Sequence, residues 1–92
     1  MGRRSIYKYT IDEVGTQTLT LPAGSKILSV INQRDVIRIY AMVDPRTERT
    51  EKYSIEIYGT GHTIRHDDTY KFLGTVVLYD GDRVFHVFYK KL

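Results

Sequence analysis

The stretch "GTGHTIRHDDTY", from Gly59 to Tyr70, concentrates side chains that could do chemistry. It holds two of the three histidines, two of the seven glycines and a pair of aspartates. Glycines can turn successive backbone N–H groups toward an anion, and arginine and histidine can add positive charge. The stretch therefore predicts a site for an anionic, phosphate-bearing ligand. Its predicted residues are Gly59, Thr60, Gly61, His62, Arg65 and Tyr70.

A structural interpretation of the same stretch needs no ligand. Gly59 would end a strand, Gly61 would permit a bulge, and the histidines would hydrogen-bond within the loop. The G-x-G pair has neither the spacing nor the lysine of a phosphate-binding P-loop, and it is not a dinucleotide fingerprint. Both interpretations stay open at the level of sequence.

Metal binding and catalysis are disfavoured here, although His62, His66, Asp67 and Asp68 are of ligand type. The H-x3-H spacing suits a helix, no helix is evident, and Arg65 would oppose a cation. There is no cysteine nucleophile and no serine in a glycine-flanked elbow. The two aspartates have no visible partner for acid–base work. We therefore expect no metal, no cofactor and no enzymatic activity.

The elements that must position this stretch have the period-two alternation of half-buried strands. Antiparallel strands are expected near 5–11, 16–21, 26–33, 36–44, 51–59, 72–79 and 83–90. Short strands at this spacing predict one all-β domain over 1–92, a single small sandwich or partly open barrel of about seven strands. The expected core residues are Ile37, Ile39, Val43, Ile55, Ile57, Val76, Leu78, Phe85 and Val87.

The connections between these strands are typical of turns. "PAG" at 22–24 predicts a turn with Gly24 at positive φ, and "NQRD" a tight link. "DPRTERTE" is interpreted as a longer hairpin connection, and Asp80-Gly81 as a short hairpin turn. Between Gly61 and Lys71 the alternation stops, and "HDDTY" is compatible with a single helical turn capped by Asp67 or Asp68.

A second group of candidate residues lies mid-strand. Arg38 is flanked by apolar positions and shares a face with Tyr40 and Met42, which is typical of an interface or a binding surface. We add Arg38 as a phosphate contact and Tyr40, like Tyr70, as a ring that could stack on a base. The domain is too small to cover Val36, Tyr40 and Met42, so we expect a homo-oligomer.

Composition narrows the partners. Fourteen Lys plus Arg against eleven Asp plus Glu give a net charge of +3, spread along the chain. Nucleic-acid binders usually concentrate basic residues on one face, so nucleic acid is not the expected partner. No apolar run approaches the roughly 20 residues of a membrane span. The absence of cysteine suits a reducing cytoplasm.

Five blocks carry a family resemblance: "SIYKYTI", "TLTLPAGSKILSV", "YAMVDP", "YGTGH" and "FLGTVVLYDGDRVFHVF". In this order they resemble a family of small bacteriophage and prophage proteins, a domain of unknown function, along nearly the whole chain. Tyr40 stands where that family usually has tryptophan, "DG" replaces "GG", and "YKKL" replaces a short acidic ending.

The resemblance implies a phage gene expressed in the cytoplasm of an infected bacterium. Small phage β-proteins without catalytic residues commonly work by binding. We therefore expect an oligomeric accessory protein that sequesters a nucleotide immune signal and so counters bacterial defence. The alternatives are a virion or tail accessory module and a module that binds a host protein.

Overall fold

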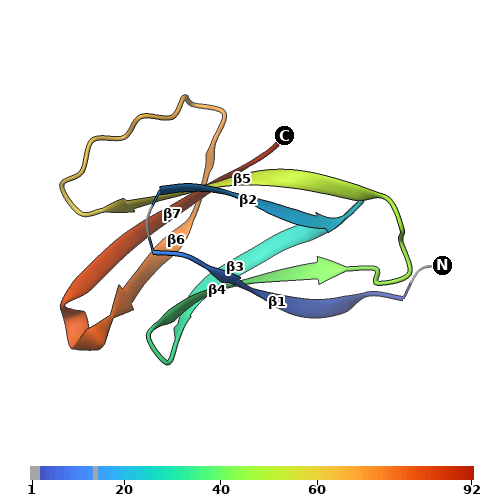
Figure 1. Cartoon of the computed structure of the whole chain (residues 1–92), viewed down its shortest axis with the longest axis horizontal. Coiled ribbons are helices and arrows are strands. Elements are labelled where there is room, and N and C mark those ends of the chain that lie inside the picture. The colour runs from blue at the N-terminus through green and yellow to red at the C-terminus, as the bar shows by residue number, and fades with distance from the viewer. Residues whose placement is uncertain (1–2, 14) are drawn as a thin grey trace.

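Seven strands in two antiparallel sheets make up the computed structural model, which describes residues 3–13 and 15–92 (Figure 1). The strands are β1 (Ser5–Ile11), β2 (Gly15–Pro22), β3 (Lys26–Gln33), β4 (Val36–Val43), β5 (Thr50–Gly59), β6 (Lys71–Leu78) and β7 (Arg83–Lys91). One 3-10 turn, Tyr79–Gly81, joins β6 to β7. None of the helical segments that the structure describes has the length and apolar character needed to span a lipid bilayer.

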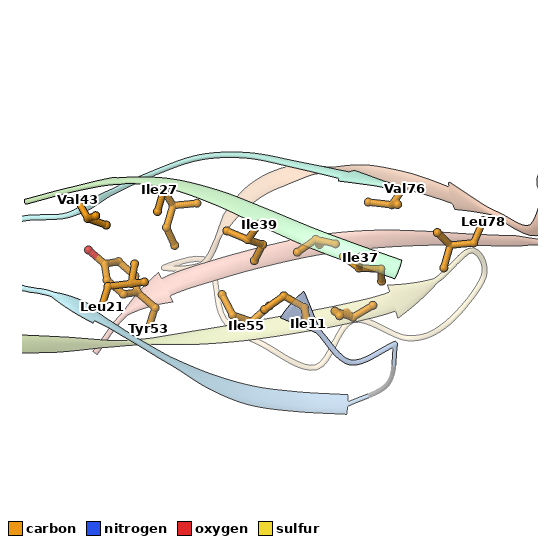
Figure 2. Close-up of a cluster of buried hydrophobic side chains, with 13 residues drawn as sticks. Ile11, Leu21, Ile27, Ile37, Ile39, Val43, Tyr53, Ile55, Val76 and Leu78 are labelled. Atoms are coloured by element: carbon orange, nitrogen blue, oxygen red, sulfur yellow. The ribbon is translucent and has the colours of Figure 1, made fainter. Parts of the chain in front are cut away.

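The two sheets pack face to face. The three-stranded sheet has the order β1-β4-β3, and the four-stranded sheet has the order β2-β5-β7-β6. Because successive side chains of a strand point to opposite faces, every second side chain lies between the two sheets, where Ile39 of β4 faces Ile55 of β5 (Figure 2). The all-β sandwich is thus confirmed, and its sheets are not closed into a barrel.

The core residues follow the predicted alternation. Fully buried side chains come from both sheets: Leu21, Ile37, Ile39, Val43, Ile55, Val76, Leu78 and Val87. Ile57 is also buried, and Phe85 packs against the core while partly exposed. The predicted core is therefore confirmed, with Phe85 at its margin.

One long side of the sandwich is joined by a seam between the edge strands β3 and β6. The Asn32 amide donates to the Val77 carbonyl at 2.8 Å, and the Tyr79 N–H donates to the Asp35 carboxylate at 2.8 Å. The backbone of Gly74 lies so close to Val30 that a Cβ on Gly74 would sit 2.9 Å from a Val30 methyl. Side chains thus join the sheets where no backbone ladder does.

The connection 44–49 does not form a hairpin. Its strands belong to different sheets, because β4 pairs with β1 and β3, whereas β5 pairs with β2 and β7. The Asp44 carboxylate accepts from Arg46 and opens a turn that crosses between the sheets. The hairpin prediction was wrong here because alternation specifies which face a residue occupies and not which strand lies beside it.

The other turns follow the sequence more closely. Gly24 has a φ of 81°, as "PAG" predicted, and Arg34 and Asp35 form the tight link between β3 and β4. The connection at Asp80-Gly81 does join β6 to β7, but the turn begins at Tyr79. It is thus longer than the two-residue turn that "DG" favours.

Candidate functional site

The Gly59–Tyr70 loop begins with a turn closed on a histidine. The His62 N–H donates to the Gly59 carbonyl at 3.1 Å, and Gly61 has a φ of 88°, as the third position of a type II turn requires. The Gly59 N–H donates to His62 Nδ1 at 3.2 Å. The His62 ring lies against Gly59, where a Cβ would approach Cε1 of the ring to 2.9 Å.

Thr60 is tied to the sheet below it. Its hydroxyl lies 2.8 Å from His86 Nε2, and His86 Nδ1 lies 3.0 Å from the Thr75 hydroxyl. His86 is a half-buried residue of β7, so the two threonines use both ring nitrogens. These bonds anchor the start of the loop to the outer face of the four-stranded sheet.

The second half of the loop rests on a cluster of aromatic rings. His66 stacks on Tyr70 with 4.5 Å between ring centroids, and its ring also contacts Tyr58 and Phe88. The Tyr70 hydroxyl donates to the Ser54 hydroxyl at 2.7 Å. Tyr58, Ser54 and Phe88 alternate with core residues, so the loop folds back over the outer face of the four-stranded sheet (Figure 1).

Asp67 shapes the turn that leads into β6. The Thr69 hydroxyl and the Thr69 N–H both donate to Asp67 Oδ1. These bonds, followed by the nearby Lys90 and His66, hold the pKa of the Asp67 carboxyl below its usual value. Of the helical turn considered for "HDDTY", the cap is present and the helix is not: Asp67 caps a turn at 68–69 that the Tyr70 N–H closes by donating to the Asp67 carbonyl at 3.4 Å.

Two shallow hollows meet at His62. One is lined by Tyr58, Gly61, His62, Thr63 and Arg65. The other is lined by Gly59, Thr60, His62, Asp82, Arg83, Val84 and Phe85. The second brings in the start of β7, which sequence analysis missed; the antiparallel pairing of Gly59 with Phe85 is what places it there.

Two groups at these hollows have their polar atoms free. Because His62 Nδ1 accepts from Gly59, the neutral ring carries its proton on Nε2, and none of the described groups hydrogen-bonds Nε2. Arg65 is exposed, and no carboxylate in the described part of the chain lies within ion-pair distance of it. His62 and Arg65 thus line one hollow with donors that the described residues do not use.

The other predicted contacts are already engaged. The Gly59 N–H and the Thr60 hydroxyl are used within the protein, so a cradle of successive N–H groups at "GTG" lacks its first member. Tyr70 is half-buried, stacked by His66, with Lys90 Nζ 5.6 Å from its ring centroid. It is not free to stack on a base.

Arg38 and Tyr40 lie on a different face. They alternate with the buried Ile37, Ile39 and Ala41, so they point outward from the three-stranded sheet, away from the loop. Arg38 donates to the Thr10 hydroxyl through Nη1, while its Nε is covered and finds no partner among the residues that the structure describes. Within one chain the structure does not bring these two residues to the loop.

No metal centre is formed by the residues at 3–13 and 15–92: they contain no group of three or more His, Cys, Asp or Glu side chains arranged to hold an ion. His66, one of the ligand-type residues, donates from Nδ1 to the Asp67 carbonyl at 2.9 Å. Its Nε2 is covered. The ring is thus used in packing.

Comparison with known proteins gives one match. A family model described as "Domain of unknown function (DUF7352)" matches residues 2–92. No curated protein and no solved structure matches the chain.

Proposed function

Because the chain belongs to the DUF7352 family, whose description carries no function, we propose one from the chemistry of its own side chains. The protein is a non-enzymatic binder of a phosphate-bearing small molecule. The ligand is held where the two hollows meet at His62. The observation that carries this proposal is Arg65, an exposed guanidinium that pairs with no carboxylate of residues 3–13 and 15–92 and lines a hollow beside His62, whose Nε2 is likewise unbonded by those residues.

The chemistry of these two groups suits phosphate. An arginine fork can donate two parallel hydrogen bonds to phosphate oxygens, and the His62 Nε2–H can donate a third. Arg83 lines the adjoining hollow, but it is paired with Glu13 at 2.9 Å and adds little free charge. Arg65 is therefore the main source of affinity.

A role without turnover is supported by the way nearby groups are used. His86 is bridged by two threonine hydroxyls, and the Ser54 hydroxyl accepts from Tyr70. The Thr60 and Tyr70 hydroxyls tie the loop to the sheet, and the Thr75 hydroxyl holds the His86 ring within the sheet. The polar groups around the hollows thus maintain shape, which suits a protein that retains its ligand.

The setting that we propose is a bacteriophage gene expressed in the cytoplasm of an infected bacterium. There the protein sequesters a nucleotide immune signal and so counters host defence. This part of the proposal rests on the resemblance of the sequence blocks to phage and prophage proteins. The protein acts as a homo-oligomer, and Arg38 and Tyr40 contribute to a ligand only from a second copy.

The first experiment is mass spectrometry of small molecules released from the protein after purification from infected cells. A released nucleotide supports the proposal and provides the ligand for titration. Arg65→Ala should then weaken binding by about 1.5–3 kcal/mol, the range for a charge-assisted hydrogen bond, with thermal stability nearly unchanged. Arg34→Ala, at the exposed β3–β4 turn, is the matched control.

His62→Ala separates the structural from the ligand-binding interpretation. It removes the Gly59–His62 bond, so it should lower stability as well as affinity. If Arg65→Ala and His62→Ala both bind every tested nucleotide as the parent does, the site is wrong. A lower unfolding temperature alone would then leave "GTGH" as a strand ending.

A second candidate function is recognition of a protein, as a virion accessory or a host-protein binder. The observation that favours it is the outer face of the three-stranded sheet, where Ile6 of β1 is 62% exposed and Ile31 of β3 is 41% exposed on either side of β4. Detection of the protein in purified virions, together with no released nucleotide, would favour this candidate over the first.

A further inference from the structure

A third hollow, of about 290 Å³, opens at the end of the sandwich where β3 and β6 begin and β7 ends. Ile27 of one sheet and Tyr53 of the other line it, and both are buried, so the hollow reaches between the sheets. It shares no lining residue with the two hollows at His62. We refer to it as the lysine mouth, because four lysines surround it: Lys26, Lys71, Lys90 and Lys91.

The positive charge of the lysine mouth is only partly neutralised. Lys91 pairs with Glu51 at 2.7 Å, and Lys90 lies 3.9 Å from Asp67. Over the described residues, no carboxylate lies within ion-pair distance of Lys26 or Lys71, and both are exposed. An excess of two positive charges therefore surrounds one concave site.

The walls add aromatic surface and tyrosine hydroxyl groups. Tyr53 donates to the Ser25 carbonyl at 3.3 Å, and the half-buried Tyr89 lines the same hollow. Burial, with the nearby Glu51 carboxylate, raises the pKa of the Tyr53 hydroxyl, which therefore stays neutral. A cavity with apolar walls and a few convergent polar groups is typical of a small-ligand site.

We propose that the lysine mouth binds a compact polyanion of the di- or triphosphate class, at a site separate from His62 and Arg65. Lysine serves phosphate as a mobile point charge, and Lys26 and Lys71 approach from the two sheets. The volume lies at the lower end of ligand sites, roughly 300–1,000 Å³, so it encloses linked phosphates and leaves any attached base outside.

The test is calorimetric titration of the full chain with inorganic pyrophosphate. The double variant Lys26→Gln/Lys71→Gln should bind roughly tenfold more weakly or worse, because it removes two charge-assisted contacts. The matched control is Lys8→Gln/Arg34→Gln, which makes the same change in net charge at positions outside the lining. An equal loss in both doubles would show a general charge effect and overturn the site, as would no pyrophosphate binding to the parent.

Further titrations distinguish the lysine mouth from the hollows at His62, and a free polyphosphate from a nucleotide as the ligand. Loss of pyrophosphate binding in Arg65→Gln but not in the lysine double would overturn the lysine mouth and leave the proposed function standing. The reverse result would support the lysine mouth alone. ADP binding as tightly as pyrophosphate identifies the phosphates as the recognised part, and tighter ADP binding identifies a nucleotide. Orthophosphate binding as tightly as pyrophosphate would contradict a polyanion site.

Amide chemical shifts of the unmutated protein provide a readout that does not depend on the folding of variants. Pyrophosphate should shift the amides of Ser25 to Ile27, Lys71 and Tyr89 to Lys91. Shifts confined to Gly59–Arg65 would place the anion in the hollows at His62 and overturn the proposal.

Discussion

Gly59 allows the loop to close, because its missing side chain leaves room for the His62 ring. Gly59→Ala would place a Cβ 2.9 Å from Cε1 of that exposed ring, which must swing away and lose its hydrogen bond to the Gly59 N–H, so the protein should be destabilised by roughly 0.5–1.5 kcal/mol. In a His62→Ala background the same change should cost much less. Urea denaturation of the four proteins measures this coupling. An equal cost in both backgrounds would contradict the contact.

Glu51 makes a pH-sensitive contribution to stability. The Lys91 ammonium, the Gly24 N–H and weaker charges hold the pKa of the Glu51 carboxyl below its usual value. A lowered folded pKa means that this contribution is present above the unfolded value of about 4.3 and is lost as the pH falls through the folded pKa.

Glu51→Gln keeps an acceptor for Gly24 and removes only the charge. Its thermal unfolding temperature should lie below that of the parent near pH 6, and the difference should shrink toward pH 3. Glu48→Gln is the control, because Glu48 is exposed and takes part in no ion pair within the described ranges. A difference that does not change with pH would contradict the prediction.

At the level of elements, the seam between β3 and β6 depends on the close approach of Gly74 to Val30. Gly74→Ala should destabilise the protein by roughly 1–3 kcal/mol through overpacking. Val30→Ala should make room, so the double variant should be more stable than the two single costs predict, by about 1 kcal/mol. Val36→Ala, a half-buried valine on β4, is the matched control and should add independently to Gly74→Ala.

The strands could be predicted from sequence because the alternation of apolar and polar residues along each strand indicates which side chains face the core. β4 was expected at 36–44 and is Val36–Val43, and β5 was expected at 51–59 and is Thr50–Gly59. The partners of these strands could not be predicted in the same way. Alternation determines which residues face the core, whereas the pairing of β5 with β2 and β7 depends on contacts that are distant in sequence.

The Gly59–Tyr70 loop likewise has one feature that the sequence predicted and others that it did not. Its position was predictable, because the alternation stops between β5 and β6. Sequence alone did not show that His66 and Tyr70 would stack on each other and cover the outer face of the sheet. The lysine mouth was missed because its lysines are far apart in the chain. The antiparallel pairing of Lys71 with Tyr89, beside Lys90, is what brings them together.

At the scale of the whole molecule, we predict self-association through the outer face of the three-stranded sheet. Val36, Tyr40 and Met42 are half-buried there, and Ile6 and Ile31 are the more exposed apolar residues. Light scattering at micromolar concentration should give a mass above that of the monomer. The double variant Ile6→Ser/Ile31→Ser should shift it to monomer, whereas Ile64→Ser, in the loop, should not.

Salt provides a second readout of this association. The same face carries Lys8 and Arg38, and two copies would bring these cations together. Screening shortens from about 10 Å at 0.1 M salt to about 3 Å at 1 M, so the larger species should increase with salt. A single monomeric species at both concentrations would contradict self-association.

The pairing order of the strands also has a consequence for the speed of folding. The ladders β3–β4 and β6–β7 join neighbours in the sequence, whereas β1–β4, β2–β5 and β5–β7 join strands separated by other strands. Each ladder between distant strands requires the closure of a long loop, and this entropy cost is met before the contacts of the ladder can stabilise it. The chain should therefore fold on the roughly millisecond-to-second timescale of all-β sandwiches, with the two hairpins formed early and the β1 and β2 edges added late.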